Sequence, residues 1–183
     1  MMTKQALRKY FRDRRHHLSS FLRQQAAQQL LDIVLQHRLL DEKQFIACYL
    51  SQDNELNLTP LIDYLWQQNK AVYLPVIAQE RLVFKLYRKD TRMHVGPYGI
   101  LEPETIETIS HDQLDLVFVP LVAFDQSGNR LGMGKGFYDK TFQDQRSVLM
   151  GVAYACQEAE NLPVDCWDVP LSGVITEAEF IQI

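Results

Sequence analysis

Apolar residues recur along the chain with two different periods, and these periods predict the order of helices and strands. From Thr3 onward, Leu7, Phe11 and Leu18 follow helical spacing. Serine caps and a Thr-Pro pair mark further helix starts. We therefore expect helices over 3–18, 20–37, 59–69 and 138–142.

Short runs of apolar residues predict the strands, at 45–50, 71–76, 82–87, 115–120, 148–154 and 174–176. Most of these runs are continuously apolar rather than alternating, which indicates strands covered on both faces. Helices and strands in this order predict a single three-layer α/β/α domain over residues 1–183, Rossmann-like, with a largely parallel central sheet. In such a sheet the ligand crevice lies at the carboxyl ends of the strands, so we expect the functional residues in those loops.

Composition narrows the class of protein. With 183 residues, 46% hydrophobic and 23% charged, the chain has the amino-acid usage of one folded globular domain. Its longest apolar stretch, 114–124, is far shorter than the roughly 20 residues of a membrane span. Three cysteines without a C-x-x-C pair argue against a disulfide framework and a zinc site. With no secretory signal segment in sight, we expect a cytoplasmic protein without a membrane partner, and a monomer.

The charge along the chain is uneven. Residues 1–23 carry seven Lys or Arg and a single Asp, although the whole chain has a net charge of −4. One stripe of the first predicted helix contains Lys4, Arg8, Arg12 and Arg15. Basic groups one turn apart can bind a polyphosphate, although a solvated helix face is the common alternative. A non-catalytic nucleic-acid-binding protein is another alternative, but no RNA or DNA motif accompanies the helix and the remaining chain is acidic.

A glycine-rich segment carries the strongest local signal. Gly132, Gly134 and Gly136 stand at alternate positions just before a predicted helix. Glycines leave backbone N–H groups unobstructed, and such groups beside a helix start can bind phosphate. Arg130 and Lys135 would supply countercharge. The spacing is neither a Walker A loop nor G-x-G-x-x-G, and a plain turn is the alternative.

Isolated acidic and aromatic residues near these segments are further candidates. Glu55 follows the first strand, where a carboxylate can accept hydrogen bonds from a ligand ring, although a loop glutamate is usually only solvated. Asp139 lies just past the glycines, where it is either an oxygen ligand for Mg²⁺ or an acid that complements the helix dipole. Met93 and Tyr98 are either walls for a flat heteroaromatic ligand or core. No nucleophile motif or histidine metal spacing is present, so covalent catalysis is not indicated.

Five motifs occur in chain order and together cover nearly the whole chain. They are K-x-x-L-R at 4–8, Y-L-S-x-x-x-E at 49–55, Y-G-I-L-E-P at 98–103, N-R-L-G-x-G-x-G-x-Y-D at 129–139 and P-V-D-x-x-D-V-P at 163–170. In this combination the sequence resembles the 5-formyltetrahydrofolate cyclo-ligases, also called 5,10-methenyltetrahydrofolate synthetases. The glycine block with its terminal Tyr-Asp is the most specific of the five.

The resemblance implies an enzyme that uses ATP and Mg²⁺ to cyclise 5-formyltetrahydrofolate to 5,10-methenyltetrahydrofolate, with release of ADP and phosphate. The family's ATP-binding positions fall on Lys4, Arg8, Arg130, Leu131, Gly132, Met133, Gly134, Lys135, Gly136, Phe137 and Tyr138. Its folate-binding positions fall on Leu50, Glu55, Met133, Gly134, Lys135, Gly136 and Phe137, and its metal ligands on Asp139 and Asp168. The expected partners are these small molecules and not nucleic acid. A sugar-phosphate isomerase or acyl-transferase of similar fold is an alternative by analogy alone, and ATP dependence separates it from the cyclo-ligase.

Overall fold

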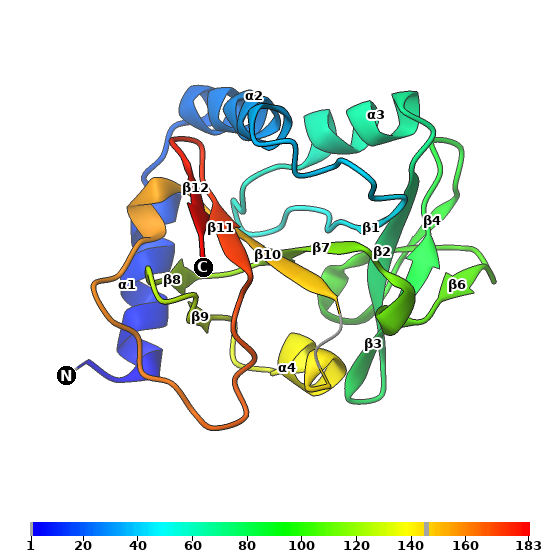
Figure 1. The fold of residues 1–183 in the computed structure, drawn as a ribbon. Coiled ribbons are helices and arrows are strands. Elements are labelled where there is room, and N and C mark those ends of the chain that lie inside the picture. The colour runs from blue at the N-terminus through cyan, green and yellow to red at the C-terminus, as the bar shows by residue number, and fades with distance from the viewer. Residues whose placement is uncertain (1, 145–146) are drawn as a thin grey trace.

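The helices of the computed structural model, which describes residues 2–144 and 147–183, occupy the positions that the apolar spacing predicts (Figure 1). In this part of the chain they are α1 (Lys4–His16), α2 (Ser20–Gln36), α3 (Thr59–Gln67) and α4 (Phe137–Phe142), with 3-10 turns at Pro97–Gly99, His111–Gln113 and Ala155–Gln157. Thr3 and Ser19 cap α1 and α2 through their side-chain oxygens. Pro60 stands in the first turn of α3, where a missing N–H costs no hydrogen bond.

Eight of the described strands form one sheet. Its central strands are β1 (Phe45–Ala47), β2 (Ala71–Ala78), β7 (Leu116–Pro120), β10 (Val148–Val152) and β11 (Gly173–Ile175), and its outer strands are β3 (Arg81–Leu86), β6 (Thr108–Ile109) and β12 (Phe180–Gln182). The order is β12-β11-β10-β7-β1-β2-β3-β6. The five central strands run parallel and the outer ones pair antiparallel. The prediction of a largely parallel α/β sheet is confirmed.

Two short hairpins stand apart from this sheet. One pairs β4 (Met93–Val95) with β5 (Leu101–Pro103), and the other pairs β8 (Ala123–Phe124) with β9 (Arg130–Leu131). The second hairpin leads directly into the glycine-rich segment and α4. The sequence pattern marks these regions only as glycine-rich loops.

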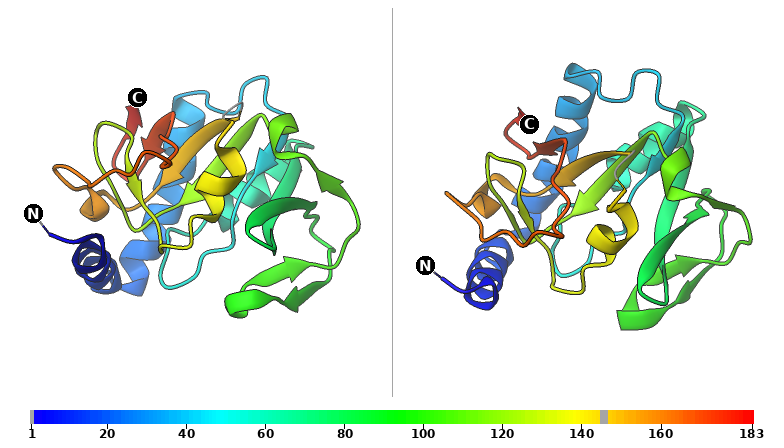
Figure 2. Two further views of the ribbon diagram at one scale, coloured as in Figure 1. Left: turned by 90° about the horizontal axis from the view of Figure 1, so that it is seen from below. Right: turned by 60° about the horizontal axis from the view of Figure 1, so that its bottom comes forward.

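Side chains alternate across the sheet and fill a core on each face. Along β7, Leu116 and Phe118 belong to the core that α2 and α3 cover, whereas Val117 and Val119 belong to the core that includes Phe142 of α4. All four are buried, as the continuous apolar run predicts. α2 and α3 lie side by side on one face, and α4 lies on the other (Figures 1 and 2). The second helical layer is thin, because loops accompany this one short helix.

The first strand is shorter than its apolar run predicts. β1 ends where its pairing with β7 stops, so the following residues are not part of the sheet. Tyr49 remains buried, and its hydroxyl donates a 2.7 Å hydrogen bond to the Leu56 carbonyl, which closes the segment into a loop. The candidate folate residues Leu50 and Glu55 therefore share one loop, residues 48–58, at the carboxyl end of β1.

Candidate functional site

The N-terminal half of the basic stripe on α1 faces loops of the same chain. Lys4 Nζ donates hydrogen bonds to the carboxylates of Asp165, at 2.7 Å, and Asp168, at 3.0 Å. One turn later, Arg8 Nε donates to the carbonyl of Gly132, at 2.8 Å. These residues are not a freely solvated helix face. Instead, the stripe brings the N-terminus of the chain against the glycine-rich segment and the segment before β11.

The C-terminal half of the stripe binds one aspartate. Arg12 Nε and Arg15 Nη2 donate to Asp53 Oδ2 at 2.8 and 2.7 Å, and His16 Nε2 lies 2.8 Å from Asp53 Oδ1. Burial raises the pKa of Asp53, but the hydrogen bonds from Arg12 and His16 and the two positive charges outweigh it and lower that pKa to about 2. We call Arg12, Arg15, His16 and Asp53 the Asp53 clasp. It joins α1 to the loop 48–58.

Gly134 allows the glycine-rich segment to contact Arg8. Gly134 and Gly136 have φ values of +95° and +68°, which only glycine adopts readily. A Cβ atom on Gly134 would lie 3.2 Å from the guanidinium carbon of Arg8. Among the described residues, no atom lies within 4 Å of the corresponding positions at Gly132 and Gly136. The backbone of this segment therefore faces open space beside the Arg8 cation.

Arg130 and Asp139 form a partly buried ion pair behind the glycine-rich segment. Arg130 Nη2 lies 2.5 Å from Asp139 Oδ1, and Arg130 Nη1 donates to the carbonyl of Val169. Val169 N in turn donates to Asp139 Oδ1, at 3.1 Å. Only 6% of the Arg130 side chain is exposed, and this burial lowers the pKa of Arg130 although Asp139 opposes the shift. The pair fixes the start of α4 to the segment before β11, so Arg130 is a fixed charge rather than a mobile cation.

The candidate metal ligands each pair with a cation. Asp139 pairs with Arg130, and Asp168 pairs with Lys4. Within the described residues, no group of three or more His, Cys, Asp or Glu side chains could hold a metal ion. Mg²⁺ commonly takes one or two protein carboxylates and completes its shell with phosphate oxygens and water. The donor set therefore fits a Mg²⁺ carried by a nucleotide and does not fit a metal cage built by the protein alone.

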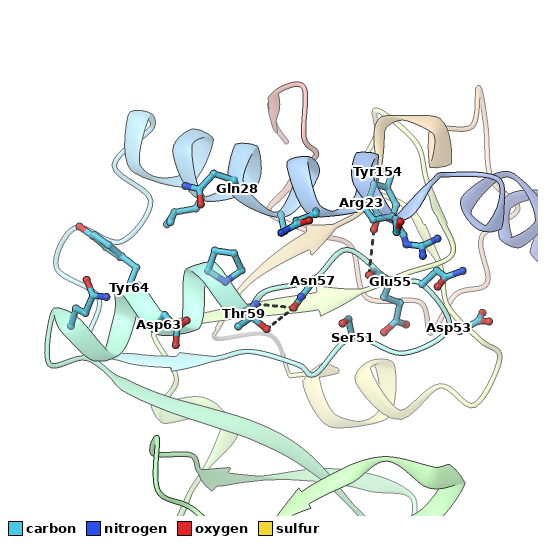
Figure 3. A pocket seen from close by; sticks show the side chains of 17 residues that line it. Arg23, Gln28, Ser51, Asp53, Glu55, Asn57, Thr59, Asp63, Tyr64 and Tyr154 are labelled. Carbon is cyan, nitrogen blue, oxygen red and sulfur yellow. Dashed lines mark hydrogen bonds between the residues drawn. The ribbon is translucent and has the colours of Figure 1, made fainter.

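The carboxylate of Glu55 is held by its own loop beside the start of α4. Gln52 N donates to Glu55 Oε2 at 3.0 Å. The Tyr154 hydroxyl donates to the Glu55 backbone carbonyl at 3.4 Å, as the dashed line in Figure 3 shows. Burial raises the pKa of Glu55, while the Gln52 hydrogen bond and the charge of Arg15 oppose the shift. The pKa of Tyr138 is raised too, first by burial and then by the Glu55 charge. The charge of Glu55 therefore acts on the start of α4, just after the glycine-rich segment.

The β4–β5 hairpin carries an exposed aromatic ring toward the same segment. Tyr98, at the tip, is 66% exposed and has a φ of +59°. Lys135 Nζ lies 5.3 Å from the centroid of its ring, and the ring centroid of Phe137 lies 6.4 Å away. Gln52 Nε2 donates to the Gly99 carbonyl at 3.2 Å, which joins the hairpin to the loop 48–58. Tyr98 is therefore one wall of the candidate site.

Three of the candidate residues are packing positions. Leu131 is 2% exposed in the core beneath α1, so only its backbone is free to approach a ligand. Leu50 and Met93 are half-buried and pack against the core that α2 and α3 cover. Met133, by contrast, is 53% exposed on the glycine-rich segment. Of the two candidate walls for a flat ligand, Met93 packs against the core and Tyr98 faces the site.

A polar cleft of about 940 Å³ lies between α2, α3 and the loop 48–58 (Figure 3). Asp53, Glu55 and Tyr154 line it, together with Arg23 and other polar side chains of the two helices. The two ends of the loop are packed in the core that α2 and α3 cover, through Tyr49 and Leu56 among others. The turn between them borders the cleft, and side-chain hydrogen bonds of the Asp53 clasp join it to α1.

Comparison with known proteins identifies the family. A family model described as the 5-formyltetrahydrofolate cyclo-ligase family matches residues 1–177. The chain belongs to this family. The 5-formyltetrahydrofolate cyclo-ligase of Haemophilus influenzae is 41% identical over 182 residues, covering 94% of this chain and 96% of that protein. The protein of the same name from Escherichia coli K12 is 36% identical over 176 residues, covering 92% and 97%.

Solved structures agree with this assignment. The NMR structure of Aquifex aeolicus 5,10-methenyltetrahydrofolate synthetase matches with a TM-score of 0.88 and 31% identity, over 99% of this chain and 93% of that one. A synthetase of the same name from Mycoplasma pneumoniae matches with a TM-score of 0.80 and 25% identity, over 96% and 99%. The chain is thus an enzyme with the cyclo-ligase fold, as its five motifs predict. No described helix has the length and apolar character needed to span a membrane.

Several residues of the site are not among those that the sequence indicates, and Asp53 and Tyr154 are two of them. Asp53 binds partners 37 to 41 positions away, and Tyr154 reaches a carbonyl 99 positions away. Nothing in the local pattern distinguishes Asp53 from its neighbours. The one available signal was the membership of Arg15 in the basic stripe, because a basic residue on an otherwise apolar side of a helix requires a counter-ion.

Proposed function

We propose that this protein uses Mg-ATP to close 5-formyltetrahydrofolate to 5,10-methenyltetrahydrofolate, with release of ADP and phosphate. The names of its relatives support the folate substrate and the ring closure. The observation that carries the ATP part is the contact between Arg8 and the glycine-rich segment, where Arg8 binds the Gly132 carbonyl and lies against Gly134. A cation from the N-terminal helix and the open glycine backbone of residues 132–136 meet there, and both are features that a triphosphate requires.

The chemistry requires alignment and charge neutralisation rather than a nucleophilic side chain. The oxygen of the formyl group that N5 carries is a poor leaving group. It becomes a good one when it receives the γ-phosphoryl group of ATP, because it can then leave as phosphate. N10 then attacks the activated carbon and loses its proton, the C–O bond breaks, and phosphate departs to leave the methenyl bridge. Fixed positive charges and backbone N–H groups suffice for such a reaction. The site has these groups.

On the nucleotide side we assign the phosphates to Lys4, Arg8, Lys135 and the backbone of the glycine-rich segment. The hydrogen bonds from Lys4 to Asp165 and Asp168 outweigh burial and raise the pKa of Lys4, so it is a cation at neutral pH. Those two carboxylates hold Lys4 beside the segment that Arg8 contacts. A bound phosphate competes with them for the ammonium group.

On the folate side we assign the pterin ring to Glu55, Tyr98 and Phe137. An ionised carboxylate only accepts hydrogen bonds, and the pterin ring offers N–H donors. Tyr98 provides an exposed face for the ring, with Phe137 next to it. Because Gln52 binds both the Glu55 carboxylate and the hairpin of Tyr98, the acceptor and the aromatic wall are joined.

Mg²⁺ accompanies ATP in this proposal, and Asp139 is the protein residue we assign to it. The hydrogen bonds described for Asp139 both end at Oδ1, so Oδ2 is the atom we assign to the ion. Bound there with the phosphates, Mg²⁺ would offset phosphoryl charge. Asp168 is the second candidate, and its Oδ2 already accepts hydrogen bonds from Lys4 and from Asp165 N. The cytoplasmic location and the monomeric state stay predictions.

One assay tests the proposal. Purified protein is incubated with 5-formyltetrahydrofolate, and the absorbance of the methenyl product is followed with and without Mg-ATP. We expect product only with Mg-ATP, and a large loss of activity at low ATP in Arg8→Ala. The matched control is Arg38→Ala, because Arg38 forms an exposed surface pair with Asp41. Product formation without ATP, or no product at all, would overturn the proposal.

A further inference from the structure

The loop that carries Glu55 contains two consecutive residues in the left-handed backbone conformation. Asp53 and Asn54 have φ values of +48° and +60°. Aspartate and asparagine adopt this conformation more readily than other residues with a Cβ atom. The two residues form the turn that leads into Glu55, and the contacts of this turn indicate what orients it.

The Asp53 clasp is the strongest of those contacts. Three side chains of α1 converge on the Asp53 carboxylate, each within 2.8 Å. Inside the loop, Glu55 N donates to the Gln52 carbonyl at 2.8 Å, and Gln52 N donates back to the Glu55 carboxylate. Both ends of the loop, which include Tyr49 and Leu56, are buried in the core that α2 and α3 cover, whereas the turn between them borders the cleft. The clasp is the set of side-chain contacts that joins this turn to α1.

Arg15 makes the clasp more than a surface ion pair. Its side chain is 1% exposed, its Nη1 donates to the Leu121 carbonyl at 3.4 Å, and its buried Nε has no partner among the described residues. A buried cation requires a counter-ion. Asp53 supplies it, with Oδ2 2.7 Å from Arg15 Nη2, and Glu55, two residues further along the same loop, also feels the Arg15 charge. Without the Asp53 charge, Glu55 is the group that Arg15 would attract.

We propose that Asp53 is a positioning residue for the folate substrate. By neutralising Arg15, it leaves the Glu55 carboxylate free to accept hydrogen bonds from the pterin. Through Arg12 and His16 it also fixes the folate-side loop to α1, the helix that carries the nucleotide-side residues. This inference rests on the proposed function, because the role of Glu55 comes from there.

The test is a double-mutant cycle between Asp53→Asn and Glu55→Gln. Asparagine has the size of aspartate and tolerates the left-handed conformation, so Asp53→Asn removes the charge alone. We expect the KM for 5-formyltetrahydrofolate to rise at least roughly tenfold, with a much smaller change in the KM for ATP. In the Glu55→Gln background, Asp53→Asn should have no further effect on the folate KM, because it acts through Glu55. Asp41→Asn, which removes the charge of an exposed pair with Arg38, is the control and should change neither constant.

The possible outcomes separate the inference from the proposed function. Suppose the wild-type protein turns over, but Asp53→Asn and Glu55→Gln have additive effects on the KM for folate. This result would overturn the inference alone, because a merely structural residue acts independently of Glu55. A wild-type protein that forms no product with Mg-ATP overturns the proposed function and the inference with it. If Asp53→Asn does not fold, Arg12→Gln, which removes a partner that is 39% exposed and leaves Arg15 paired with Asp53, tests the attachment of the loop to α1. It should raise the folate KM by a smaller factor, again only when Glu55 is present.

Discussion

Replacing Gly134 with alanine perturbs the site at one defined contact. A residue with a Cβ atom in a left-handed conformation costs about 1–2 kcal/mol, and Gly134 has a φ of +95°. The new Cβ atom would also lie 3.2 Å from Cζ and Nη2 of Arg8, so the guanidinium must move by a few tenths of an ångström. That movement weakens its hydrogen bond to the Gly132 carbonyl. A charge-assisted hydrogen bond contributes about 1.5–3 kcal/mol, so losing part of it should raise the KM for ATP about three- to tenfold.

The neighbouring glycines provide matched controls for this prediction. Gly136→Ala introduces the left-handed strain without a steric contact, and Gly132→Ala introduces neither. The assay is the KM for ATP at saturating folate, beside a thermal melt, for each variant alone and in the Arg8→Ala background. We expect Gly134→Ala and Gly136→Ala to lower the melting temperature similarly and Gly132→Ala to lower it less.

The dependence on Arg8 decides the result. In the Arg8→Ala background the contact is absent, so Gly134→Ala should raise the KM for ATP only as much as backbone strain does. Gly136→Ala measures that effect of strain. If Gly134→Ala raises this KM by the same factor with and without Arg8, or if Gly132→Ala raises it as much, the reasoning about the contact is refuted.

Three further variants test other parts of the site. Glu55→Gln should weaken folate binding and yet melt at a higher temperature than wild type near neutral pH. Because the raised pKa of the half-buried Glu55 carboxylate costs stability only where the carboxylate is ionised, this gain should vanish below about pH 4, and a gain independent of pH would contradict the prediction. Asp139→Asn should lower kcat and shift the Mg²⁺ requirement upward. Since Asp139 also pairs with buried Arg130, its melting temperature falls in either case, and an unmoved Mg²⁺ curve would defeat the metal assignment. Tyr98→Ala should raise the KM for folate and Tyr98→Phe should not, and a rise confined to the KM for ATP would contradict the aromatic wall.

The features that the sequence predicts well are those set by local pattern. The helix start at Thr3 and the continuous apolar run of β7 depend on neighbouring residues, and both are found as expected. The glycine-rich segment was recognisable because alternate glycines are unusual in any regular element. Its contact with Arg8 was partly predictable, since the basic stripe and the glycines are both features that bind phosphate.

The features that could not be predicted depend on long-range contacts or on backbone conformations unusual for their residue types. The β2–β3 hairpin turns at Gln79, which has a φ of +59° although glycine or asparagine is the usual signal for such a turn. Tyr98 and Asp53 adopt left-handed conformations as well, and although both stand in segments that the sequence marks as loops, their residue types do not indicate which position takes this conformation. The end of β1 was missed because Tyr49 is buried in a loop rather than in the sheet.

The central claim is that α1, the glycine-rich segment and the Glu55 loop form one site for both substrates. The most direct measurement counts ADP and methenyl product together in a single reaction of the purified protein. We expect one ADP for each methenyl group formed, no ADP without folate, and a loss of both products in parallel in Arg8→Ala and in Glu55→Gln. ADP release that is independent of folate, or Glu55→Gln protein that releases ADP at the wild-type rate without forming the methenyl product, would contradict a shared site.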